Sequence, residues 1–188
     1  MNTVVMEQRK KIHPHKFTLW IGIGSILMMF AGLTSAYIVK RNQPKWLTFD
    51  LPLAFWYSTA FIVLSSITFF LAGRSFKNRQ MAKYRRLLIA TILLGVLFIL
   101  LQVIGFQQLW QKGVTFYANV SFQFLYVIVG LHAAHVIGGI IALLVLFAKA
   151  FRAKIKNYNT VPVEVVSTYW HFVDVLWIYL LLFLLMIR

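Results

Sequence analysis

The chain of 188 residues contains no cysteine, only four acidic residues and only four prolines. The absence of cysteine excludes a disulfide framework, an iron–sulfur cluster, a thiolate zinc site and a cysteine nucleophile. Charged residues make up 12% of the chain, about half of what a soluble globular domain carries. Because 61% of the residues are hydrophobic and the mean hydropathy is +0.78, the composition excludes an ordinary soluble fold.

The hydrophobic residues gather in long uninterrupted runs. A membrane-spanning helix needs about 20 mostly apolar residues. A transmembrane β-barrel is excluded, because its strands would alternate apolar and polar residues and these runs do not. Five runs qualify, none with a lysine or arginine inside it: 17–39, 51–73, 87–109, 120–148 and 165–187. The sequence therefore predicts an all-α integral membrane protein. We expect a five-helix bundle in which residues 17–188 form one membrane domain after a cytoplasmic tail, residues 1–16.

The net charge of +15 is unevenly distributed between the connections. The N-terminal tail and the second and fourth connections hold 14 of the 19 lysines and arginines, and the remaining connections and C-terminus hold five. Because cytoplasmic loops are enriched in these residues, we expect the N-terminus in the cytoplasm and the C-terminus outside. We interpret the basic charge as a topological signal, with no role in binding nucleic acid. The cluster in residues 74–86 is equally suited to anionic lipid headgroups.

The informative residues are the few polar side chains in or beside the apolar runs, because an ionisable group in a membrane must face protein or water. In the fourth run, His132 and His135 share one helical face. Near and within the fifth run, Glu164, His171 and Asp174 share another. We expect these faces to turn toward each other or toward a partner, and His171 to hydrogen-bond to Asp174 one turn away.

These histidines admit three interpretations. Two facing histidines, His132 or His135 with His171, could ligate a haem. Two histidines with Asp174 could hold a metal ion or take part in proton transport. A buried polar cluster that fixes the register of the helices is the interpretation that the pattern favours, because helical metal-binding pairs are more often four residues apart than three.

Three segments resemble motifs of the cytochrome c oxidase subunit III family. The sequence YWHFVDVLW, Tyr169–Trp177, resembles the family's terminal-helix motif YWHFVDxxW, and Glu164 stands where the family has a glutamate before that helix. The sequence GLHAAHVIGG, Gly130–Gly139, resembles GFHGxHVxxG. Residues 25–37 resemble SExMFFAGLxxAY, and the whole resemblance covers about residues 17–188.

The resemblance implies a non-catalytic subunit III of a proton-translocating haem–copper terminal oxidase, which reduces oxygen to water in aerobic respiration. It implies a short five-helix form in the bacterial cytoplasmic membrane. Such a subunit holds phospholipid and has no cofactor of its own, since haem and copper belong to its partners, subunits I and II. Seven residues are then expected to act in helix packing, subunit contact or lipid association: His132, His135, Glu164, Trp170, His171, Asp174 and Trp177.

The chain departs from the family at two acidic positions. Ile26 stands where the family motif has a glutamate, and Gly105 stands where many members have another, which puts proton uptake through these acids in doubt. The motifs also occur in quinol oxidases, so the electron donor, the haem types and membership of a larger respiratory supercomplex stay open. A haem-binding membrane anchor and a small transporter are the alternatives from other classes, although the runs lack the interior prolines that could break a transporter helix.

Overall fold

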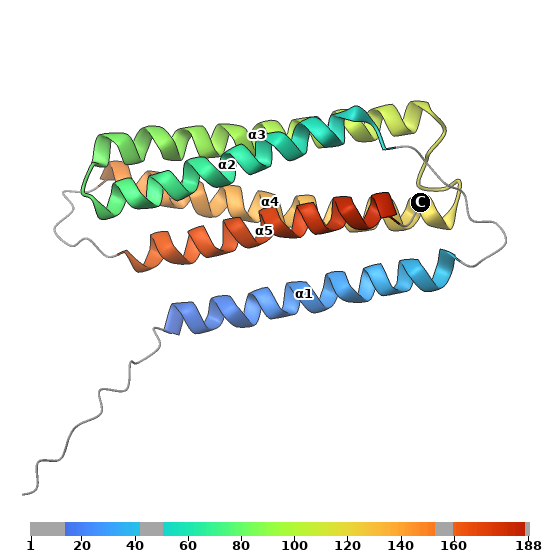
Figure 1. Ribbon diagram of the computed structural model, residues 1–188, viewed down its shortest axis with the longest axis horizontal. Coiled ribbons are helices and arrows are strands. Elements are labelled where there is room, and N and C mark those ends of the chain that lie inside the picture. The colour runs from blue at the N-terminus through green and yellow to red at the C-terminus, as the bar shows by residue number, and fades with distance from the viewer. Residues whose placement is uncertain (1–13, 42–50, 153–159, 187–188) are drawn as a thin grey trace, which may run out of the picture.

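The computed structural model describes residues 14–41, 51–152 and 160–186, which form five long α-helices (Figure 1). These helices are α1 (Pro14–Arg41), α2 (Leu53–Lys77), α3 (Met81–Gln111), α4 (Val120–Arg152) and α5 (Val161–Met186). Each helix is long and apolar enough to cross a membrane, and the described residues include no strand. The predicted all-α fold with five spanning helices is confirmed.

Four of the helices form the body of the bundle, and the first lies at its side (Figure 1). Helix α2 packs against α3 and α5, and α4 packs against α3 and α5, which closes a ring of four helices. Among the described residues, α1 contacts only α4 and α5. Helix α5 touches α1, α2 and α4 and is the most enclosed helix: half of its spanning segment is buried, against 17% for α1.

The helices extend beyond the apolar runs from which they were predicted. The second connection, expected at residues 74–86, shrinks to the turn between Lys77 and Met81, where Arg79 adopts a positive φ of 59°. Glu164, expected before the fifth helix, lies in its first turn. Hydropathy marks only the part of a helix that lies in hydrocarbon, whereas lysine and arginine are good helix formers that continue the same backbone hydrogen bonding beyond it.

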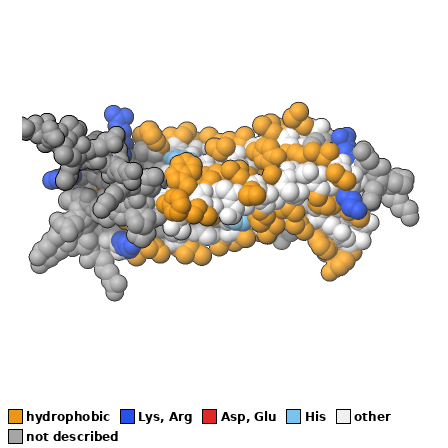
Figure 2. All heavy atoms as spheres, turned by 90° about the horizontal axis from the view of Figure 1, so that it is seen from below, with side chains coloured by type: hydrophobic (Ala, Val, Ile, Leu, Met, Phe, Trp, Pro, Cys, Tyr) orange, Lys and Arg blue, Asp and Glu red, His pale blue; other side chains and the backbone are white. Residues whose placement is uncertain are grey.

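The surface of the bundle has an apolar middle and basic ends. Figure 2 shows hydrophobic side chains along the middle of the visible face and lysine or arginine near both ends. Large apolar side chains such as Met28 and Phe70 are 78% and 63% exposed. Because single exposed apolar residues are ordinary but a whole exposed belt is not, this surface suits lipid chains and apolar partner helices.

Candidate functional site

The side chains of α5 that resemble the family motif hydrogen-bond mainly to α2. We call these contacts the α2–α5 ladder, and its pairs are Trp170 with Ser65, His171 with Ser66, and Trp177 with Thr59. The two indole nitrogens donate to the serine and threonine oxygens at 3.2 Å and 2.9 Å, respectively. Between Trp170 and Trp177 the chain advances along α5, while the partner moves back along α2 from Ser65 to Thr59. The ladder therefore fixes one register of two antiparallel helices. The sequence predicted the α5 half of the ladder and missed the hydroxyl groups on one face of α2.

Trp170 occupies a slot between two further helices. The side chain is 1% exposed, and its ring lies against Gly95 of α3 and Gly139 of α4. A methyl group on Gly139 would lie 2.8 Å from Cε3 of the indole, and one on Gly95 would lie 2.9 Å from Cη2. Real side-chain carbons do not approach so closely, so only glycine leaves room for the ring at these points.

His132 is fully buried in an aromatic cage. Its ring stacks on Trp177, with centroids 5.0 Å apart, and meets Phe98 and Phe30 edge to face at 6.0 Å and 6.5 Å. Neither ring nitrogen has a hydrogen-bond partner among the described residues. The ring therefore acts as a packing element between α3, α4 and α5, and it contributes no hydrogen bond to the expected histidine cluster.

His135 lies one turn further along α4 and is tied to its own helix. Its Nδ1 lies 2.7 Å from the carbonyl oxygen of Leu131, and its ring meets Phe30 edge to face at 5.8 Å. The Tyr169 hydroxyl donates to the His135 carbonyl oxygen at 3.0 Å. The expected meeting of the α4 and α5 faces thus includes ring packing and the hydrogen bond from the Tyr169 side chain to the α4 backbone.

The predicted hydrogen bond between His171 and Asp174 is wrong. The Nδ1 atom of His171 bonds instead to the Ser66 hydroxyl group across the interface with α2. That hydroxyl also lies near the Asp174 carboxyl group, yet neither Asp174 oxygen has a hydrogen-bond partner within the described part of the chain. Residues one turn apart on a helix share a face, but here a polar group on the neighbouring helix lies closer to the ring.

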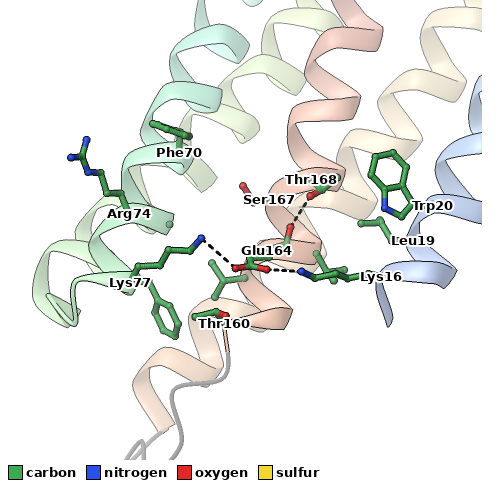
Figure 3. Close-up of a pocket in the computed structure, with 14 residues that line it drawn as sticks. Lys16, Leu19, Trp20, Phe70, Arg74, Lys77, Thr160, Glu164, Ser167 and Thr168 are labelled. Carbon is green, nitrogen blue, oxygen red and sulfur yellow. Dashed lines mark hydrogen bonds and ion pairs between the residues drawn. The ribbon is translucent and has the colours of Figure 1, made fainter. Parts of the chain in front are cut away.

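Glu164 lies at the rim of a pocket of about 660 Å³ between α1, α2 and α5 (Figure 3). Its carboxylate pairs with Lys16 of α1 at 2.8 Å and with Lys77 of α2 at 3.3 Å. The side chains of the three residues are between one-third and two-thirds exposed, so these ion pairs each contribute little free energy, about 0–1 kcal/mol. They join three helices at the end of the bundle where α5 begins.

The seven residues predicted for the site do not converge on one centre. Within residues 14–41, 51–152 and 160–186, no group of three or more histidine, aspartate or glutamate side chains is arranged to hold a metal ion. Gly105 packs against Phe55, where an added methyl group would lie 2.8 Å from the phenyl Cε2. A glutamate at this position has no room beside that ring, and partly buried Ile26 packs against the apolar core.

The fold and these contacts describe a helical membrane protein whose polar motif serves internal packing. The family model for cytochrome c oxidase subunit III matches residues 43–187. The probable cytochrome c oxidase subunit 3 of Mycobacterium leprae is 32% identical over 177 residues, covering 89% of this chain and 85% of the relative. The probable subunit 3 of Nocardia farcinica is 33% identical over 164 residues, covering 84% and 80% of the two chains. The chain therefore belongs to the cytochrome c oxidase subunit III family.

Substitution of Gly139 by alanine tests the slot that holds Trp170. Gly139→Ala forces the indole to move, and overpacking of this kind costs about 1–3 kcal/mol. We expect a lower apparent midpoint of thermal unfolding, measured by circular dichroism in mild detergent. The matched control is Gly130→Ala on the same helix, where an added methyl group meets nothing within 4 Å. Equal midpoints for the two variants would contradict the tight slot.

Proposed function

We propose that this chain is the non-catalytic subunit III of a proton-translocating haem–copper terminal oxidase that reduces oxygen to water. The family match over residues 43–187 carries the proposal. It is supported by the α2–α5 ladder, which engages the motif tryptophans and His171 in contacts between helices. These residues stabilise the bundle, while electron transfer and oxygen chemistry take place on cofactors of other subunits.

The partners in this proposal are subunits I and II, which carry haem and copper, in a bacterial cytoplasmic membrane. The outward face of α1 supports a contact with another helix. Gly22, Ser25 and Gly32 are exposed there, and a methyl group on either glycine would meet nothing within 4 Å. Small residues allow membrane helices to approach closely, so this face can accept a helix of a neighbouring subunit.

The pocket beside Glu164 is the proposed position of a bound phospholipid. Its walls include apolar Leu19, Trp20 and Phe70, and Arg74 and Lys77 stand on its α2 side (Figure 3). Apolar walls suit an acyl chain, and basic side chains near a membrane surface attract an anionic headgroup. Phospholipid analysis of the purified protein should therefore show lipid that survives extraction.

Purification through an affinity tag on this chain tests the proposed function. In mild detergent, subunits carrying haem and copper should accompany the chain, and the complex should consume oxygen. The chain alone, separated afterwards, should show no haem absorbance and no stoichiometric iron or copper. The rates at which the purified complex oxidises reduced cytochrome c and a quinol are then compared, and the faster reaction identifies the electron donor.

Two results of that purification would contradict the proposal. If no oxidase subunits accompanied the chain, it would not be a subunit of an oxidase. Haem that stays with the separated chain and disappears in His171→Ala would instead make the chain a haem-binding membrane anchor. The transporter alternative has little support, because each of the five described helices is continuous.

The proposed orientation places the N-terminus in the cytoplasm. The ends of α2 and α4 and the starts of α1, α3 and α5 gather at one end of the bundle (Figure 1), which is the end rich in lysine and arginine. Because the chain has no cysteine, single introduced cysteines report their location without background. In intact cells, an impermeant thiol reagent should label a cysteine added after Arg188 and should leave Glu7→Cys unlabelled. The reverse labelling would overturn the orientation.

A further inference from the structure

Asp174 is an acid in the middle of a spanning helix, and no charged side chain among the described residues pairs with it. The residue is 3% exposed, and neither carboxyl oxygen has a hydrogen-bond partner in the described residues. An isolated carboxylate in an apolar interior costs many kcal/mol, and an intramembrane acid with no structural partner marks a functional site. Because the residue is enclosed by this chain, a side chain of another subunit cannot reach it without opening the bundle.

The helices packed against α5 offer Asp174 no counter-ion. The apolar runs of α1 and α2, residues 17–39 and 51–73, contain no lysine, arginine or histidine. On α4, His132 is enclosed by aromatic rings and His135 is bonded to its own helix. On α5 itself, His171 is bonded through Nδ1 to Ser66, and its Nε2 is buried without a partner.

A line of polar side chains on α5 leads from the pocket at the basic end of the bundle toward Asp174. On α5, Ser167 lines the pocket, and His171 and then Asp174 follow at successive turns of the same face. On α2, Phe70 lines the pocket, and Ser66 lies one turn further into the membrane. Ser66 and His171 are only partly buried, whereas Asp174 is buried, so the line of polar side chains ends at an enclosed acid.

We propose that Ser66, His171 and Asp174 form an internal hydration site that holds Asp174 as a neutral carboxylic acid and exchanges its proton with water at the basic end of the bundle. The neutral form removes the cost of a buried charge. The acid donates its proton in a hydrogen bond to an internal water, which can also meet the Ser66 hydroxyl group. A second water is needed for the Nε2 atom of His171, because Ser66 lies on the Nδ1 side of the ring. A buried water needs two to four polar partners, which these groups supply.

Exchange at this site changes no covalent bond other than O–H bonds. The carboxyl group gives its proton to the neighbouring water, and a proton from the water chain returns to the carboxylate. The exchange moves protons only between the carboxyl group and water, so charge and atoms are conserved. No oxidant, reductant or metal takes part. The site lies wholly within this chain, so the inference does not depend on the proposed oxidase partners.

Infrared difference spectroscopy tests the site in the protein purified with whichever subunits accompany it. The spectrum of wild type minus Asp174→Asn, at mildly alkaline pH, should contain the carbonyl stretch of one un-ionised carboxylic acid. In D₂O this band should move to lower frequency, because its proton exchanges. Asparagine has nearly the same size and is also neutral, so the variant should fold and keep the thermal midpoint of wild type.

Two further variants make the spectra decisive. Wild type minus Glu164→Gln should lack an acid band, because Glu164 pairs with two lysines as a carboxylate. Wild type minus Ser66→Ala should show the Asp174 band displaced in frequency, and this comparison serves if Asp174→Asn cannot be purified. A carboxylate signal in place of the acid band would overturn the neutral acid. An acid band unaffected by the loss of Ser66 would overturn the part of Ser66 in the hydration site. A band that does not move in D₂O would overturn the hydration.

Discussion

The hydrogen bonding and packing of α5 against its neighbours is the constraint on which the rest of the bundle depends. Lipid chains are as apolar as leucine, so the hydrophobic effect does not hold membrane helices together; close packing and interhelical hydrogen bonds do. The α2–α5 ladder supplies the hydrogen bonds, and Trp170, seated between Gly95 and Gly139, supplies the packing. Helices α2, α3, α4 and α5 all meet at this one side chain, whereas α1 touches only α4 and α5.

The sequence was sufficient for the features that composition and periodicity encode. It predicted the number of helices and the polar faces of α4 and α5, because long apolar runs and ionisable residues within them are unambiguous in a membrane. It did not predict that His171 bonds to Ser66, since a serine in an apolar run carries no signal of which helix it faces. Nor could it predict the slot at Gly139, because the distance to Trp170 depends on how three helices meet.

The polar motif of this chain is used for packing between its own helices. The tryptophans and histidines of α4 and α5 are used between the helices, and His132 acts only as a ring in an aromatic cage. The surface is left apolar along the middle and basic at the ends, as lipid and partner helices require (Figure 2). Gly105 and Ile26 stand at the two positions where the family motif or many family members have glutamates. Asp174 is therefore the one acid in the middle of the described helices.

A double-mutant cycle across the ladder tests the central claim most directly. Thr59→Val removes the hydroxyl group that accepts the Trp177 indole proton at 2.9 Å, and Trp177→Phe removes the donor. The free energy of unfolding should be measured in mild detergent for wild type, both single variants and the double variant. A hydrogen bond between membrane helices should give a coupling of about 0.6 kcal/mol, up to about 1.7 kcal/mol. A coupling of zero would contradict the account, because α5 would then be held to α2 by packing alone.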